Sequence, residues 1–249
     1  MPHSHVRLLW HRLCFYSVVV IFGVMCLAWS LPAAAFYRLV PRRHRSRVGQ
    51  WGIMTGFRIY LAIMRATGLA FFDLRALDAL AAEPPMILVS NHRSLLDAVL
   101  VMSRLPRVVC ITKASLWDNR FLGGGIRMAG YIRNDTPLRL IRAAAAAVRG
   151  GQHLLIFPEG TRSASAQLAA FKPGFALVAK AAHAPVQVVI LESTSPYLQK
   201  GWGLFKMPEF PLIYKARLGR RFDIGPDLSQ GAAAVEAHMR ELLDQGGGP

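Results

Sequence analysis

The stretch from Leu13 to Tyr37 is twenty-five residues long and carries no charged side chain. An α-helix needs about 20 predominantly apolar residues to cross the hydrocarbon core of a bilayer. So long an apolar run is unfavourable in water, because it exposes a large apolar surface. We therefore expect the chain to begin with a membrane-associated helical segment.

Three placements of this run remain open. The first is a spanning helix; more basic residues follow the run than precede it, and this bias would keep the body of the protein cytoplasmic. The second is a hairpin that bends at Pro32 and enters one leaflet. The third is a cleaved signal peptide, because Ala33–Ala35 resembles a cleavage site, although the run exceeds the usual apolar core of about 7–15 residues. The following segment, Trp51–Leu74, contains Arg58 and Arg65, which favours an interfacial helix.

The net charge of the chain indicates which partners it binds. A formal net charge of +16 suits either nucleic acid or an anionic membrane. Juxtamembrane arginines are each attracted to anionic headgroups by about 1 kcal/mol, whereas a nucleic-acid binder should show a reading motif or interleaved aromatic residues. We expect membrane lipids as partners and no nucleic acid, because the densest basic run directly follows the apolar stretch and consists of Arg38, Arg42, Arg43, Arg45 and Arg47.

The pattern changes after Pro84 and Pro85 to short apolar runs that alternate with helical stretches. This alternation predicts an α/β fold, with a mixed, largely parallel sheet flanked by helices. The expected strands are Met86–Ser90, Val108–Thr112, His153–Phe157, Val186–Leu191 and Leu212–Leu218. The expected helices are Ser94–Arg104, Leu138–Arg149 and Gly174–His183.

A histidine and an aspartate follow the first expected strand. His92 lies at the end of that strand, and Asp97 lies just inside the next helix. An imidazole there can take a proton from an alcohol if a carboxylate holds its other ring nitrogen. Taken alone, this spacing also suits a capping aspartate beside a loop histidine.

A second polar segment follows the strand at His153–Phe157. It reads Phe157-Pro158-Glu159-Gly160-Thr161-Arg162-Ser163. Backbone amides around a glycine, together with an arginine and hydroxyl groups, form a suitable cradle for an oxyanion or a phosphate. In this interpretation Arg162 grips the anion, and Glu159 orients a hydroxyl or a neighbouring cation.

Together these segments resemble the 1-acyl-glycerol-3-phosphate acyltransferases and their glycerolipid relatives. The N-H-x-S-x-x-D block is matched by Asn91, His92, Ser94 and Asp97, and F-P-E-G-T-R-S is matched by Phe157 to Ser163. The F-K-x-G that follows is matched by Phe171, Lys172 and Gly174. The resemblance covers about residues 84–220. We expect residues 81–249 to form the acyltransferase domain, and residues 1–80 to hold the membrane anchor, interfacial helices and basic linker.

The resemblance also implies a reaction. His92, oriented by Asp97, would deprotonate the hydroxyl of a lysophospholipid, most simply 1-acyl-glycerol-3-phosphate, which attacks the thioester of acyl-CoA or acyl carrier protein. Neither a cofactor nor a metal is implied. Acceptor binding would fall to Asn91, Ser94, Lys113, Arg133, Glu159, Gly160, Thr161, Arg162, Lys172 and Gly174. The expected location is the bacterial inner membrane, with the catalytic domain on the cytoplasmic side.

Two blocks depart from the family pattern. The second block is close to G-x-I-F-I-D-R in the family, but here Gly130 begins Gly-Tyr-Ile-Arg-Asn-Asp-Thr, so its arginine is displaced to Arg133 or absent. The fourth block keeps one proline, Pro185, where the family has two. Lys113–Trp117 and Gly130–Ile132 resemble a divergent bacterial branch of the family. The altered second block leaves a different lipid or polyene-type acceptor as one alternative, and a non-catalytic membrane scaffold is a second.

Other kinds of site are not indicated. The chain contains no G-x-S-x-G segment and no complete phosphate-binding glycine loop, since Gly123-Gly124-Gly125 lacks the residues that should follow. Cys14, Cys26 and Cys110 form no C-x-x-C pair, which gives neither a disulfide framework nor a zinc site.

Overall fold

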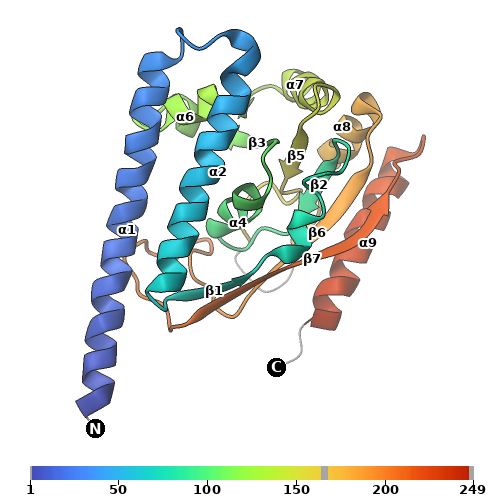
Figure 1. The fold of residues 1–249 in the computed structure, drawn as a ribbon. Coiled ribbons are helices and arrows are strands. Elements are labelled where there is room, and N and C mark those ends of the chain that lie inside the picture. Colours follow the sequence, from blue (N-terminus) through green and yellow to red (C-terminus); the bar gives the residue numbers. More distant parts are fainter. Residues whose placement is uncertain (1, 164–167, 247–249) are drawn as a thin grey trace.

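Seven strands form one sheet in the computed structural model, which describes residues 2–163 and 168–246 (Figure 1). Their order across the sheet is β1-β7-β6-β2-β5-β3-β4. Every neighbouring pair is parallel except β6 and β7. The predicted mixed, largely parallel sheet is therefore confirmed. The strands are β1 (Ala70–Asp73), β2 (Ile87–Ser90), β3 (Val108–Lys113), β4 (Ile132–Asn134), β5 (His153–Ile156), β6 (Val186–Ser193) and β7 (Leu212–Phe222).

The central strands are those whose sequences are apolar throughout. All four residues of β2 and all four of β5 are buried, as expected for parallel strands covered on both faces. All five predicted strands are present, with boundaries shifted by a few residues. The short strands β1 and β4 were not predicted, because Ala70–Asp73 continues an apolar stretch and Ile132–Asn134 has only three residues.

Helices cover both faces of the sheet (Figure 1). The helices α7 (Pro137–Arg149), α8 (Gly174–Ala182) and α9 (Leu228–Gly246) pack in series on one side. On the other side, α4 (Leu96–Arg104) packs under α2 (Arg42–Ala66), and α2 packs against α1 (Pro2–Phe36). The shorter helices are α3 (Arg75–Asp78), α5 (Ala114–Trp117) and α6 (Gly123–Met128).

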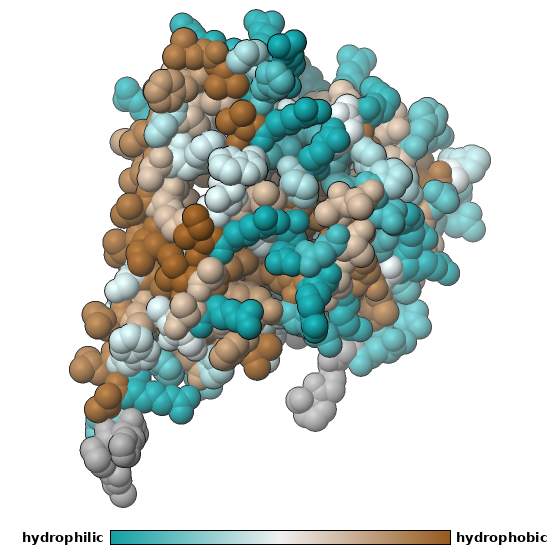
Figure 2. Space-filling view, in the orientation of Figure 1, coloured by the Kyte–Doolittle hydropathy of each residue, from teal (hydrophilic) through white to brown (hydrophobic). Residues whose placement is uncertain are grey.

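The apolar stretch near the N-terminus forms one long helix. α1 continues through Pro32 to Phe36, and the chain reverses direction in residues 37–41 before α2 begins. The predicted hairpin bend at Pro32 is therefore wrong, because the chain turns only after Phe36. Residues His5–Phe36 are long and apolar enough to cross a membrane, and only 17% of the most apolar window is buried. Hydrophobic residues gather along the exposed side of α1 in Figure 2.

Glycines allow α6 to lie very close to both N-terminal helices. A Cβ atom on Gly124 would come within 2.2 Å of the Ser30 carbonyl oxygen in α1, and one on Gly49 of α2 would come within 2.2 Å of the Ala129 nitrogen. The run Gly123-Gly124-Gly125 thus serves helix packing. The division at residue 80 stays a prediction; the sheet itself includes β1, which pairs with β7.

Candidate active site

The sheet topology brings the two polar segments together. β2 and β5 are parallel neighbours, with Val89 opposite Ile156. The loops that begin at Asn91 and Phe157 therefore leave the same edge of the sheet side by side. Ligand sites in α/β sheets form at this edge, beyond the carboxyl ends of the strands.

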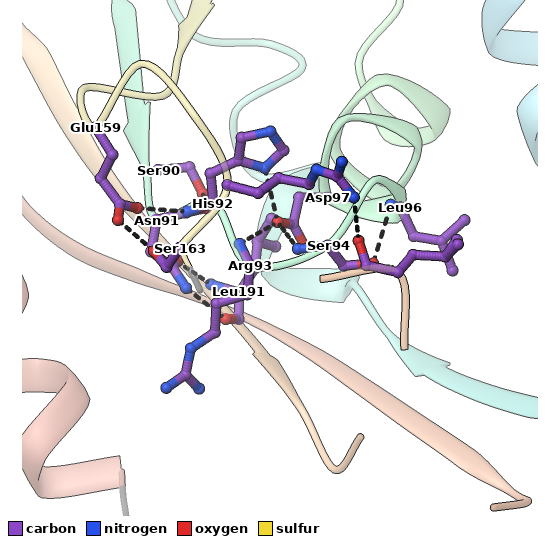
Figure 3. A network of polar contacts seen from close by, with 12 residues as sticks. Ser90, Asn91, His92, Arg93, Ser94, Leu96, Asp97, Glu159, Ser163 and Leu191 are labelled. Atoms are coloured by element: carbon purple, nitrogen blue, oxygen red, sulfur yellow. Dashed lines mark hydrogen bonds and ion pairs between the residues drawn. The ribbon is translucent and has the colours of Figure 1, made fainter. Parts of the chain in front are cut away.

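His92 and Asp97 form the predicted pair (Figure 3). The His92 Nδ1 atom lies 3.0 Å from Asp97 Oδ2, and the same oxygen accepts hydrogen bonds from the backbone N–H groups of Arg93 and Ser94, each at 2.7 Å. These amides fix the carboxylate at the start of α4. With Nδ1 donating to Asp97, the His92 Nε2 atom keeps its lone pair and can accept a proton.

The histidine ring is also held from a side that the sequence did not indicate. The ring of Phe157 stacks on the ring of His92, with centroids 4.0 Å apart and an interplanar angle of 19°. Phe157 follows β5 directly, so the neighbouring strand ends bring the two rings together. The sequence pattern marked Phe157 only as part of a motif and gave no sign of this stacking.

Glu159 joins the two loops through both oxygens of its carboxylate. Its Oε1 atom accepts a hydrogen bond from the His92 backbone N–H at 2.9 Å, and its Oε2 atom accepts bonds from the Ser163 hydroxyl and the Ala169 N–H. The Ser163 N–H in turn donates to the His92 carbonyl at 2.8 Å. Glu159 is 4% exposed. It therefore fixes the backbone that carries the histidine (Figure 3).

Asn91 and Ser94 also stabilise the loop from within. The Asn91 amide exchanges two hydrogen bonds with the backbone of Leu191 in β6, each at 2.8 Å. The Ser94 hydroxyl donates to the Tyr197 carbonyl at 2.9 Å. Both side chains are buried. The structure thus places these two predicted binding residues in the framework of the loop.

A cavity of about 990 Å³ opens beside His92 and extends between the N-terminal helices and the sheet. Its walls are largely apolar and include Phe22 and Trp29 of α1, Phe57 of α2 and Met102 of α4. Farther along, burial raises the pKa of Cys110 to about 12, so this thiol stays uncharged at neutral pH. The cavity therefore presents an uncharged apolar wall that adjoins a polar site.

In the described part of the chain, three cationic side chains line the same cavity. They are Lys113 at the end of β3, Arg162 and Lys172. Gly160, with a φ of +73°, lies so close to Lys172 that an added Cβ would be 2.8 Å from its Nζ atom. Gly160, Thr161 and Gly174 complete this side of the wall. These predicted binding residues and His92 thus surround one space.

Arg162 is tied to a loop that the sequence did not single out. Its Nη1 atom donates to the carbonyl oxygens of Leu198, at 2.6 Å, and Gln199, at 3.1 Å. The Leu198 carbonyl also accepts the Leu95 N–H at 3.3 Å. Leu198 has a φ of +61°, an uncommon conformation for this residue type. This loop therefore connects Arg162 with the segment that carries His92.

Arg133 is engaged elsewhere. Its guanidinium pairs with the carboxylates of Asp118, at 2.6 Å, and Asp135. Among the described residues, those that line the cavity include Asn134 and Asp135 but not Arg133. The structure therefore brings Arg133 near the site but leaves it paired with acidic neighbours. Asp118 is 15 positions away in the sequence, so spacing alone could not indicate this pair.

Comparisons with known proteins agree with this geometry. The Acyltransferase family model matches residues 72–192. The 1-acyl-sn-glycerol-3-phosphate acyltransferase of Limnanthes alba is 35% identical over 136 residues, which cover 52% of this chain and 48% of the relative. The human 1-acyl-sn-glycerol-3-phosphate acyltransferase beta is 30% identical over 193 residues, 74% of this chain and 66% of the relative. The chain thus spans about half the length of the Limnanthes protein.

A solved structure shares the fold. The crystal structure of the 1-acyl-sn-glycerophosphate acyltransferase from Thermotoga maritima superposes with a TM-score of 0.69 at 18% identity, covering 97% of this chain and 96% of that chain. At this identity the likeness concerns the fold. The assignment rests on the match to the family model and on the similarity to several curated acyltransferases. The chain belongs to the acyltransferase family.

Proposed function

We propose that this protein transfers a fatty acyl group from a thioester donor to the hydroxyl of a lysophospholipid, 1-acyl-glycerol-3-phosphate being the first acceptor to consider. The observation that carries the proposal is the 3.0 Å contact between His92 and Asp97, at a cavity whose wall is largely apolar and includes three cationic side chains. An acyl chain suits the apolar part, and a phosphate monoester suits Lys113, Arg162 and Lys172.

In the proposed mechanism, His92 is a general base that acts through its Nε2 atom. It takes the proton of the acceptor hydroxyl as the oxygen attacks the thioester carbonyl. Asp97 stabilises the imidazolium that forms, because its Oδ2 atom is already fixed by two backbone amides. When the tetrahedral intermediate collapses, the C–S bond breaks and the imidazolium returns the proton to the leaving thiolate. The products are an ester and a free thiol, and no acyl-enzyme forms.

The proposed donor is acyl-CoA or acyl carrier protein. Each presents a thioester at the end of a flexible phosphopantetheine arm, so the same cavity wall can receive either acyl chain. The scaffold alternative is less well supported, since the His92–Asp97 contact and the cavity beside it are both intact.

A specific observation favours a second acceptor class. Arg133, the displaced arginine of the second block, pairs with Asp118 and Asp135. Fewer cations are therefore available to a phosphate than the family pattern implies. A less highly charged lipid hydroxyl, including a polyene-type one, is the alternative acceptor that this pairing supports.

The test is an acceptor panel with labelled acyl-CoA and acyl carrier protein donors, run on the wild type and on His92→Gln. Loss of a general base should lower turnover by about 10²–10⁴-fold. Lysophosphatidate should be acylated faster than a neutral lysolipid of equal chain length. Unchanged transfer in His92→Gln would reject the mechanism, and preference for the neutral acceptor would favour the second acceptor class.

A further inference from the structure

A second cavity, of about 490 Å³, lies at the turn between α1 and α2, next to the end of α6. Among the residues that the structure describes, none that lines this cavity also lines the cavity beside His92. The two cavities are therefore distinct, and the mechanism proposed above makes no use of the second. Its wall is formed by Tyr37, Arg42, Arg45, Ser46, Arg127, Met128 and Gly130.

The wall of this second cavity is strongly basic. Arg42, Arg45 and Arg127 contribute three arginines to its wall. None of the three takes part in an ion pair within residues 2–163 and 168–246. The first acidic residue of the whole sequence is Asp73, so neither N-terminal helix brings a carboxylate. The cavity is thus suited to an anion.

Packing holds Arg45 and the wall beside it in place. The Arg45 Nε atom donates to the Val40 carbonyl at 2.9 Å, and its guanidinium carbon lies 4.3 Å from the centre of the Tyr37 ring. These contacts leave the terminal nitrogens of Arg45 for another acceptor. Across the cavity, a Cβ on Gly130 would lie 3.4 Å from the Ser46 side chain, so α2 and the end of α6 are close together. The site is partly organised before any anion binds.

The surroundings of the cavity indicate the source of the anion. Leu31, Phe36 and Leu39 are large exposed hydrophobic residues at this end of α1 and in the turn, and Leu39 is 74% exposed. The hydrophobic side of α1 reaches this end of the molecule in Figure 2. A ligand that offers a phosphate to the arginines and acyl chains to these residues would satisfy both surfaces at once. A free phosphate would satisfy only the arginines.

We propose that this second cavity binds the phosphate of an anionic membrane phospholipid, whose acyl chains lie along the exposed apolar face of α1. Arg42 and Arg45 hold the phosphate by charge-assisted hydrogen bonds, and Ser46 and Tyr37 offer hydroxyl groups. The lipid is a structural ligand that sets how the α1–α2 end meets the membrane. This proposal does not depend on the identity of the acyl acceptor.

The experiment separates this site from general attraction between a basic protein and an anionic membrane. Arg42→Gln/Arg45→Gln removes two charges from the cavity. Arg43→Gln/Arg47→Gln removes two charges from the same basic run, at exposed positions outside the cavity lining. Binding is measured by flotation with vesicles of phosphatidylcholine alone, and with vesicles that also contain phosphatidylglycerol. The salt concentration is raised to about 1 M, where the Debye length is about 3 Å and long-range attraction is screened.

In high salt the wild type and Arg43→Gln/Arg47→Gln should keep a preference for phosphatidylglycerol. Arg42→Gln/Arg45→Gln should lose that preference by at least about tenfold, because a single charge-assisted contact already contributes about that factor and two are removed. Arg42→Gln alone should show part of the loss, and it breaks no side-chain hydrogen bond recorded in the described part of the chain. Equal losses in the two double variants, or no loss in either, would overturn the proposal.

A separate measurement addresses a free anion as ligand. Thermal unfolding is followed with millimolar inorganic phosphate and no vesicles. The proposal expects no difference between the two double variants in this assay. If phosphate stabilises Arg43→Gln/Arg47→Gln but not Arg42→Gln/Arg45→Gln, and the vesicle assay does not separate them, the cavity is a site for free phosphate and the lipid assignment is wrong.

Discussion

At the scale of single residues, the position of Glu159 separates two roles that its motif leaves open. A glutamate that bound the acceptor would face the cavity. The Glu159 carboxylate is instead buried, and it accepts hydrogen bonds from the backbone N–H groups of His92 and Ala169. In Glu159→Gln, one oxygen becomes a donor that faces other donors. A lost hydrogen bond to a charged group costs about 1.5–3 kcal/mol. We expect kcat to fall by about 10–100-fold while KM for the acceptor stays within about twofold.

Glu159→Gln is compared with a variant of Lys172, a cationic side chain that lines the cavity. Lys172→Gln should raise KM for lysophosphatidate, with a smaller change in kcat, and Lys180→Gln, an equal charge change at an exposed position on α8, should do neither. Steady-state kinetics with varied acceptor measures all three variants. A rise in KM as the main effect of Glu159→Gln would return the glutamate to the acceptor site.

His153 provides a pH-dependent contribution to stability. Burial lowers its pKa below the ordinary value of 6.5, and this exceeds the opposing effect of a backbone hydrogen bond at Leu80. The unfolded chain therefore takes up a proton at a higher pH than the folded chain, so stability is full above about pH 6.5 and declines as the pH falls below it. Chemical denaturation of His153→Gln between about pH 7.5 and pH 5 should show a smaller decline than the wild type. An equal decline would contradict this assignment, and His44→Gln, at an exposed position, controls for the loss of one histidine.

The motif residues show how far the sequence could determine the site. The sequence could predict that His92 and Asp97 pair, because they are only five positions apart and lie in one loop and the first turn of the helix that follows it. The roles of Asn91, Ser94 and Glu159 could not be separated from binding, because their partners lie about 70 to 100 positions away. Tertiary packing decides which motif residues face the substrate.

At the scale of elements, the hydrophobic pattern identified the central strands and α7 and α8, because these segments are bounded by proline or glycine. It did not place β1 in the sheet, since Ala70–Asp73 continues the apolar character of α2. It also gave no sign that α6 packs against α1 and α2. Those contacts depend on glycines, whose lack of a side chain carries no periodic signal.

The packing of α2 on α6 leads to an element-scale prediction. A methyl group at Gly49 would meet the Ala129 backbone at 2.2 Å, whereas one at Gly56, in the same helix, would meet nothing within 4 Å. Overpacking of this kind costs about 1–3 kcal/mol. Gly49→Ala should therefore lower the free energy of unfolding by about that amount. Gly56→Ala should raise it by up to about 1 kcal/mol, because alanine is the better helix former. Denaturant unfolding compares the two, and equal effects would refute the close approach.

At the scale of the whole molecule, α1 contacts the body at both ends. Cys14, Phe15 and Val18 are buried near one end, and Phe15 packs against Tyr197. Ser30 and Ala33 are buried near the other end, where Ser30 lies against α6. Phe15 and Ala33 are about 27 Å apart along a helix, close to the roughly 30 Å thickness of the hydrocarbon core. If α1 crossed the bilayer upright, the body that packs along it would be drawn into lipid.

We therefore expect the exposed apolar face of α1 to lie in one leaflet, with both ends of the helix on the same side of the membrane. The test uses a variant in which the three cysteines are replaced by alanine, and then carries one new cysteine at Val6 or at Leu39, both exposed. In sealed vesicles of one orientation, a membrane-impermeant maleimide should label both single-cysteine variants or neither. Labelling of only one would establish a spanning helix. In that case the contacts at Tyr197 and α6 could not both persist in the membrane, because one of them would require polar loops to enter the hydrocarbon core at a cost of several kcal/mol for each unsatisfied backbone group.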